Sequence, residues 1–225
     1  MRYINSQVIL RCKAAYYWTQ KQNELSVFQT KWNIVPNKTA IFVSWLEPGN
    51  EPSTLLYALQ LARRRDPEVK LVIVGEGRER VPLQTLAGEL GESDSVLFTG
   101  AIYDEHHLAP WMLSASLFCY PTNIGLSLMH AFGYGLPVVT GNDVGRHNPE
   151  IEAFADGVNG LFFAQGNAND LAEKWLRIMN DGALRRILSA NARVQVEQTY
   201  TLDKMVQGFR EVFAFYGQGR REAPA

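Results

Sequence analysis

The sequence has 225 residues, of which 46% are hydrophobic, and its 22 basic and 23 acidic residues leave a formal net charge of −1. A chain of this size can bury a full core and fits one large domain better than two. The near-neutral charge provides no basic field for nucleic acid, so we expect no nucleic acid partner.

The cysteines and histidines form no metal or redox pattern. Cys12 and Cys119 lie far apart, and the four histidines form no cluster, so we expect no metal site. Cys119 lies within an apolar run and is predicted to be a buried, reduced thiol. No stretch approaches the length of a membrane span, and the N-terminus lacks the apolar core of a signal peptide. These features predict a cytoplasmic protein and leave a peripheral membrane contact open.

The N-terminal segment, residues 1–38, carries the weakest pattern. Residues 8–18 are compatible with a strand or a short helix, and residues 34–37 resemble the end of a strand. We interpret this segment as the remnant of something larger.

From residue 39 onward, short apolar runs alternate with helical patterns. Each run is rich in β-branched or aromatic residues without polar alternation, which is typical of strands buried on both faces. The predicted strands are residues 40–45, 70–74, 95–98, 116–120, 137–140 and 160–163.

Helical spacing and capping residues predict the segments between and after these strands. The predicted helices are residues 54–65, 82–90, 104–111, one beginning near Leu126, 171–180, 183–198 and 202–216. Alternating strands and helices predict an α/β domain with a doubly wound parallel sheet. Helices alone follow the last strand, so we expect a helical C-terminal tail packed on the sheet domain rather than a second domain. We place the domain at residues 39–217 and a frayed tail at residues 218–225.

The loop after the fourth predicted strand is the first candidate site. It leads into a helix whose first turn holds no acidic residue, although acidic side chains usually complement the positive end of a helix. Gly125 allows close backbone approach, the N–H groups of Leu126 and Ser127 point outward, and Ser127 adds a hydroxyl. This arrangement predicts an anion site, most naturally for a phosphate. The alternative is that Thr122 or Asn123 merely caps the helix.

His130 follows on the same helix. It lies three residues after Ser127 and four after Leu126, so a helix places all three on one side. This spacing puts the imidazole beside the predicted anion site, and the alternative is a core histidine with satisfied hydrogen bonds. His106 and His107 are adjacent and are expected to face solvent.

Two further loops follow predicted strands. Gly75 and Gly77 permit a tight turn near a ligand, but a G-x-G without a third glycine in register disfavours a dinucleotide-dependent oxidoreductase. After the third strand, the backbone near Ile102 could meet the edge of a base, and Tyr103 could stack on it. An ordinary strand–helix turn would explain the same residues.

Several of these stretches also carry a family resemblance. The segments are IFVSWLEPGNEP, KLVIVGEGRER, SVLFTGAI, SLFCYPTNIGLSLMHAFGYGLPVVT and PEIEAFADGVNGLFF, in this order. They resemble the C-terminal, nucleotide-sugar-binding domain of retaining glycosyltransferases with the GT-B fold (glycosyltransferase group 1, family four) over residues 34–216. The resemblance implies a Rossmann-like half of a GT-B fold, with residues 1–38 as a remnant of the acceptor-side domain.

Four polar positions depart from the family pattern. The family has an Arg before the Leu of the first loop and a Lys four residues after that Leu, and both cations hold the donor diphosphate. Here Trp45 and Asn50 occupy those positions. The family's two glutamates, which contact the sugar and the ribose, correspond to Thr122 and His130. Losing two charge-assisted contacts should weaken phosphate binding by roughly 1.5–3 kcal/mol each.

The resemblance implies sugar transfer from a nucleotide-diphosphate sugar to an unknown acceptor, with retention and without a metal or a further cofactor. The acceptor side would come from a partner chain or from self-association. The alternative is a catalytically degenerate glycosyltransferase-fold module used for binding or assembly. We assign no catalytic residue. The predicted donor-binding residues are Thr122 and Asn123 towards the sugar, Gly125, Leu126 and Ser127 at the phosphate, His130 near the ribose, and Gly77 and Ile102 in the neighbouring loops.

Overall fold

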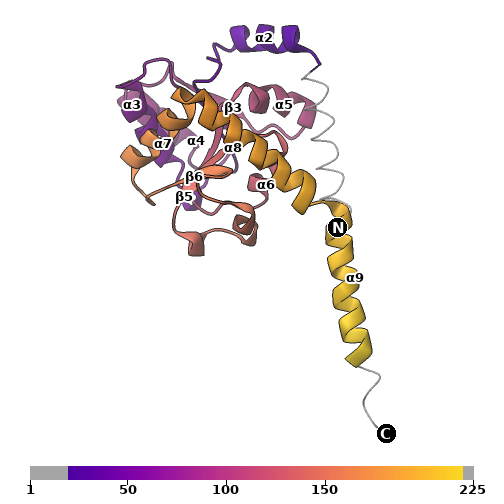
Figure 1. The fold of residues 1–225 in the computed structure, drawn as a ribbon. Helices are drawn as coiled ribbons and strands as arrows, with labels where there is room; N and C mark the ends of the chain where they lie inside the picture. The colour runs from indigo at the N-terminus through magenta and orange to yellow at the C-terminus, as the bar shows by residue number, and fades with distance from the viewer. Residues whose placement is uncertain (1–19, 220–225) are drawn as a thin grey trace.

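The structure is a computed structural model that describes residues 20–219 (Figure 1). The sequence-based expectations for residues 8–18, for Cys12 and for residues 220–225 fall outside this range.

Six parallel strands form one sheet in the order β3-β2-β1-β4-β5-β6. Each strand overlaps one of the predicted apolar runs, and the doubly wound parallel sheet is confirmed. Helices cover both faces, which explains why the strands show no polar alternation. The strands are β1 Thr39–Val43, β2 Lys70–Val74, β3 Val96–Gly100, β4 Leu117–Tyr120, β5 Val138–Gly141 and β6 Gly160–Phe163.

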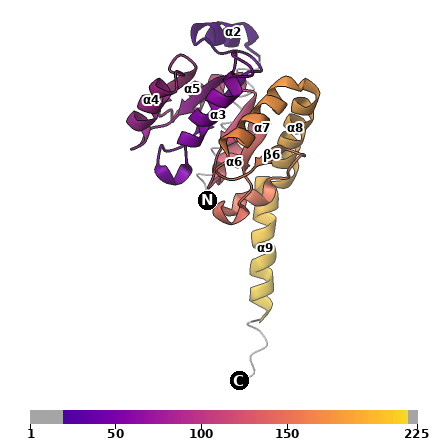
Figure 2. The same ribbon diagram turned by 90° about the vertical axis from the view of Figure 1, so that its left-hand side faces the viewer.

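The helices form two layers around this sheet. Right-handed crossovers place α3 and α4 on one face and α5 and α6 on the other. Helix α7 packs against α3, as Figure 2 shows, and α8 packs against α6. The bounds are α3 Ser53–Arg63, α4 Arg80–Glu89, α5 Glu105–Ser114, α6 Leu126–Gly133, α7 Ala168–Asn180, α8 Gly182–Val194 and α9 Leu202–Gly219.

Side-chain caps in the sequence fix where several helices begin. Asp104 accepts hydrogen bonds from the backbone N–H groups of His106 and His107 at the start of α5. Asn167 and Asp181 cap α7 and α8 in the same way. His106 and His107 are exposed, and Cys119 is fully buried, as the sequence predicts.

Residues 34–37 form a turn, so the expected strand end is wrong. Asn37 adopts a left-handed conformation with φ +67°, and the Lys38 N–H donates to the Val35 carbonyl at 3.1 Å. Helix α2, Gln22–Lys31, precedes this turn and was not predicted. It packs on α5, where the rings of Phe28 and Trp111 lie 4.8 Å apart. Tertiary contact, rather than a strong local pattern, therefore places this helix.

The C-terminal helices only partly follow the expectation that they pack on the sheet domain. Helix α7 packs on α3 and on β6, and α8 packs on α6 and α7. Helix α9 extends away from the domain (Figures 1 and 2). Val212 and Phe213 on α9 are 52% and 73% exposed. The helix runs to Gly219, past the predicted domain end at residue 217.

Candidate functional site

The candidate site lies where the chain reverses its direction across the sheet. Strand β1 pairs with β2 on one side and with β4 on the other. From β1 the chain adds β2 and β3 towards one edge of the sheet, and it then crosses back to add β4, β5 and β6 towards the other edge. In open parallel sheets, ligands bind at this switch point, outside the carboxyl ends of the strands. The loops after β1, β2, β3, β4 and β5 all open at this edge.

The turn between β4 and α6 presents an open helix N-terminus. Asn123 is left-handed with φ +63°, and α6 begins at Leu126 directly after Gly125. No side chain among the described residues caps this helix, and its first turn holds no acidic residue. The alternative that Thr122 or Asn123 caps the helix is therefore wrong. Leu126 is 53% exposed, so the first turn faces solvent.

The neighbouring loop after β5 holds this turn in place. The backbone N–H of Ile124 donates to Nδ1 of His147 at 3.2 Å, and Nε2 of the same ring bonds the Gly141 carbonyl at 2.8 Å. The Asn148 N–H donates to the Ile124 carbonyl at 3.0 Å, and Asn148 Nδ2 donates to the Asn123 carbonyl at 3.1 Å. His147 and Asn148 thus form hydrogen bonds with the peptide groups on both sides of Ile124.

Gly125 is required by close packing. A Cβ at this position would lie 3.0 Å from Nδ2 and 3.2 Å from Cβ of Asn148. The glycine lets the loop after β5 approach the turn directly, and any larger residue would push Asn148 away.

Thr122 lies inside this turn. It is fully buried, and its hydroxyl has no hydrogen-bond partner among the residues that the structure describes. The predicted contact of Thr122 with a sugar therefore requires the turn to open or a ligand group to reach the enclosed hydroxyl.

His130 is buried and already has a partner. Its Nε2 lies 3.0 Å from Oε1 of Glu105 on α5, and the Tyr134 hydroxyl donates to the same carboxylate. The structure thus shows the core histidine that the sequence left open as an alternative. The predicted role of His130 near a ribose stays a prediction, and Glu105 competes for the same ring nitrogen.

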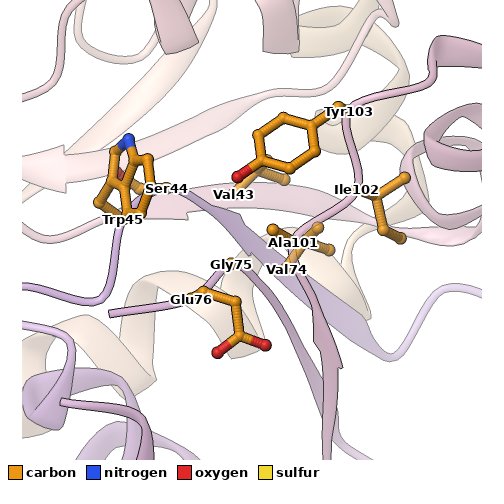
Figure 3. A pocket seen from close by; sticks show the side chains of 9 residues that line it. All are labelled: Val43, Ser44, Trp45, Val74, Gly75, Glu76, Ala101, Ile102 and Tyr103. Atoms are coloured by element: carbon orange, nitrogen blue, oxygen red, sulfur yellow. The ribbon is translucent and has the colours of Figure 1, made fainter. Parts of the chain in front are cut away.

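A cavity of about 160 Å³ opens at the ends of β1, β2 and β3 (Figure 3). Trp45 and Tyr103 project from two different loops around it and are 63% and 83% exposed. Predicted site residue Ile102 lines the cavity. Its walls are Val43, Ser44, Trp45, Val74, Gly75, Glu76, Ala101, Ile102 and Tyr103.

Gly77 lies next to the cavity but serves packing. Its φ is +154°, and a Cβ there would lie 2.4 Å from the Leu46 carbonyl oxygen. The Glu79 N–H also donates to that oxygen at 2.9 Å. The glycine therefore lets the loop after β2 lie directly on the loop after β1.

Neutral groups occupy the two positions where the resemblance expects cations. The Asn50 side chain is buried and donates to the Trp45 carbonyl at 2.8 Å and to the Ser44 hydroxyl at 3.3 Å. Ser44 shares a hydrogen bond of 2.7 Å with the Tyr120 hydroxyl. Burial raises the pKa of Tyr120, so this hydroxyl stays protonated at neutral pH.

Arginines near this edge of the sheet pair with glutamates. Arg146 binds Glu51 at 2.8 Å, and Gln165 donates to the same carboxylate at 2.8 Å. Arg78 binds Glu47 at 2.5 Å and holds the pKa of that carboxyl below its usual range. Arg80 pairs with Glu76.

No role was predicted from the sequence for four residues of this region, Arg146, His147, Asn148 and Gln165. The available signal was their position after β5, whose carboxyl end meets the end of β4. Within residues 20–219, no group of His, Cys, Asp and Glu residues is arranged to hold a metal ion. No helix in that range combines the length and apolar character needed to cross a bilayer.

Comparisons with known proteins identify the family and the fold. Residues 28–195 match the family of glycosyl transferases group 1. An uncharacterized glycosyltransferase of Haemophilus influenzae is 26% identical over 180 residues, which are 78% of this chain and 49% of the relative. The α-D-kanosaminyltransferase of Streptomyces kanamyceticus is 28% identical over 157 residues, which are 66% of this chain and 39% of that protein. The chain thus spans about half or less of these relatives.

Solved structures show the same fold. Anabaena HepE in complex with UDP superposes with a TM-score of 0.73 at 21% identity, covering 85% of this chain and 52% of HepE. Staphylococcus aureus TarM, in a complex that contains UDP, superposes with a TM-score of 0.71 at 20% identity, covering 79% of this chain and 36% of TarM. At these identities the likeness establishes the GT-B type of fold.

Proposed function

Since the chain belongs to the family of glycosyl transferases group 1, we propose that it binds a nucleotide-diphosphate sugar as the donor half of a glycosyltransferase. The transfer would move the sugar to an acceptor held by a second half, supplied by a partner chain or by self-association. We further propose that transfer proceeds with retention and without a metal or an additional cofactor.

One observation carries this proposal: the open N-terminus of α6 lies at the switch point of the sheet, and a cavity opens at the carboxyl ends of the neighbouring strands β1 to β3. Unpaired N–H groups and the helix dipole make such an end an anion site. The dipole alone contributes about 0.3–1 kcal/mol. The N–H groups of Leu126 and Ser127 and the Ser127 hydroxyl would supply the remaining contacts to a diphosphate. Donors fixed in this way also suit the charge that develops on a leaving diphosphate.

The cavity at the ends of β1 to β3 suits the base. Its walls are mainly apolar, and the exposed rings of Trp45 and Tyr103 offer faces on which a planar base can stack. A ligand with its base in this cavity and its phosphates at the N-terminus of α6 would extend over the carboxyl ends of β1 and β4. HepE and TarM have been solved in complexes with UDP, which supports a nucleotide at this fold.

The second candidate is a degenerate module used for binding or assembly. The neutral network around Asn50 and the exposed indole of Trp45 favour it, because neither replaces a cation at the diphosphate. The pairing of Arg146 with Glu51 also lowers the positive potential near the turn.

Calorimetric titration of the chain with UDP-, GDP- and ADP-sugars separates the two candidates. Leu126→Asp is the sharpest variant because its carboxylate complements the helix dipole and preserves the fold while repelling a phosphate. Leu126→Asn has the same shape without the charge. A substitution at Gly125 is less suitable because it would also displace Asn148.

We expect one nucleotide sugar to bind the wild type and the Asn variant, and the Asp variant to bind about tenfold more weakly, equivalent to a change of about 1.4 kcal/mol. Equal binding by all three folded proteins would place the phosphate elsewhere. Absence of binding to any nucleotide sugar at millimolar concentration would leave the degenerate module as the function.

A further inference from the structure

The ring of His147 makes two hydrogen bonds that together fix its protonation state. The Ile124 N–H can only donate, so Nδ1 must carry a lone pair. The Gly141 carbonyl can only accept, so Nε2 must carry the hydrogen. Only the neutral imidazole with its hydrogen on Nε2 satisfies both contacts.

These contacts join the turn before α6 to the end of β5. Ile124 directly precedes Gly125, and the turn needs the left-handed Asn123 to direct the chain into the helix. Asparagine adopts the left-handed region more readily than other residues with a side chain, and surrounding contacts then select this conformation over the extended one. The bonds from His147 and Asn148 to both sides of Asn123 and Ile124 supply those contacts.

We propose that His147, as the neutral Nε2–H tautomer, is a positioning residue that sets the phosphate-binding turn at the start of α6. This proposal rests on the proposed function for the identity of its ligand. It assigns to His147 no contact with the substrate: the ring acts through the Ile124 backbone.

Protonation of the ring would disrupt this arrangement. A charged imidazole carries hydrogens on both nitrogens, so Nδ1–H would oppose the Ile124 N–H and release the turn. The contacting segments bring no charge to the ring, since neither the turn nor β5 contains a charged residue. The charges nearest in sequence are Asp143, Arg146 and Glu150 on its own segment, and Arg146 pairs with Glu51 from the loop after β1.

Variants at this position separate the two hydrogen bonds from the volume of the ring. In His147→Asn, the side-chain oxygen can accept from Ile124 at the position of Nδ1 and does not titrate. In His147→Phe, the ring remains and both nitrogens are lost. His107→Gln is the matched control because it removes an exposed histidine on α5, outside this contact.

The first measurement is the tautomer, by long-range proton–nitrogen NMR of the ring in the ligand-free chain. We expect the Nε2–H pattern, together with slow exchange of the Ile124 amide hydrogen. A ring with its hydrogen on Nδ1 overturns the proposal.

The second measurement is the affinity for UDP-glucose. His107→Gln should bind as wild type does, and His147→Asn should bind nearly as well, because its side-chain oxygen keeps the hydrogen bond from the Ile124 N–H. His147→Phe, with its fold checked by circular dichroism, should bind about tenfold more weakly, the effect of losing one hydrogen bond.

The outcomes distinguish the two proposals. If His147→Phe binds as wild type does, the positioning role fails and the proposed function stands. If the wild type does not bind UDP-glucose or another nucleotide sugar, the proposed function fails. The tautomer and the Ile124 exchange rate then decide alone whether His147 sets the turn.

Discussion

The two halves of the candidate site are built in different ways. At the ends of β1 to β3, exposed side chains surround a cavity, and Trp45 and Tyr103 define its opening. At the ends of β4 and β5, backbone groups define the site, and His147 and Asn148 hold them by hydrogen bonds. Both halves depart from the pattern that the resemblance implies, the first at Trp45 and Asn50 and the second at Thr122 and His130, whereas the backbone features at Gly125 and Leu126 are kept.

This difference shows which part of such a site can change without loss of the fold. A side chain at the rim of a cavity can be exchanged while the strands beneath it stay packed. A backbone turn depends on several contacts at once, and each contact depends on the others. We therefore expect substitutions in the first half to change ligand affinity, and substitutions at backbone contacts to change stability as well.

The largest effect on stability is expected at Gly77, where the first half of the site also depends on a close backbone contact. In Gly77→Ala, the new Cβ would collide with the Leu46 backbone at a φ of +154°, which alanine rarely adopts. We expect a loss of about 3 kcal/mol in the free energy of unfolding, measured by denaturant titration. Gly49→Ala is the control, since no atom lies within 4 Å of its Cβ. Equal stability of the two variants would contradict the backbone contact.

Restoring a cation in the first half tests its side-chain character. Trp45 is 63% exposed, so Trp45→Arg should leave stability nearly unchanged. One charge-assisted contact to a diphosphate should tighten UDP-glucose binding by about tenfold at low salt. Trp45→Gln removes the ring without adding charge and controls for the lost stacking. If the arginine variant binds no better than the glutamine variant, the diphosphate does not pass this position.

The ion pair between the halves should give effects of opposite sign. Arg146→Gln removes the cation beside the turn, and Glu51→Gln removes the carboxylate that pairs with it. We expect roughly fivefold weaker binding for the first and about twofold tighter binding for the second, because the net potential changes in opposite directions. Calorimetry at low and high salt measures both, and changes of the same sign would contradict an electrostatic cause.

The smallest effect on stability is expected at the amino ends of the strands, on the side of the sheet opposite to the candidate site. Lys38 pairs with Asp66 before β1 and β2 and lowers the pKa of this carboxyl. A lowered folded pKa gives stability that is present above the unfolded pKa, about 3.9, and is lost as the pH falls through the folded value. Asp66→Asn should cost roughly 0.5 kcal/mol at neutral pH and less in acid. Thermal melts measure this, and UDP-glucose affinity should not change.

Much of the fold could be predicted from the sequence because strands buried on both faces need continuous apolar runs. The candidate site was placed by the rule that the carboxyl ends of parallel strands lie on one side of the sheet, and this location stays a prediction. The contacts of His147 could not be predicted, because a side chain that bridges two backbone groups leaves no local pattern. The partner of His130 lies on α5, and the helical spacing on α6 carries no information about it. Packing on α5 places α2, and the helical spacing of α9 does not reveal that this helix extends away from the domain.

The junction between β1 and β4 also bears on how the protein folds. Ala40 pairs with Leu117 across it, so this contact closes a much longer loop than the pairing of Ala40 with Leu71. Such a distant pairing tends to form late, because closing the long loop costs conformational entropy before the contact is made. A nucleotide that spans the junction would bind little before these strands meet. It should therefore slow unfolding more than it accelerates refolding, and lengthen the lifetime of the native chain.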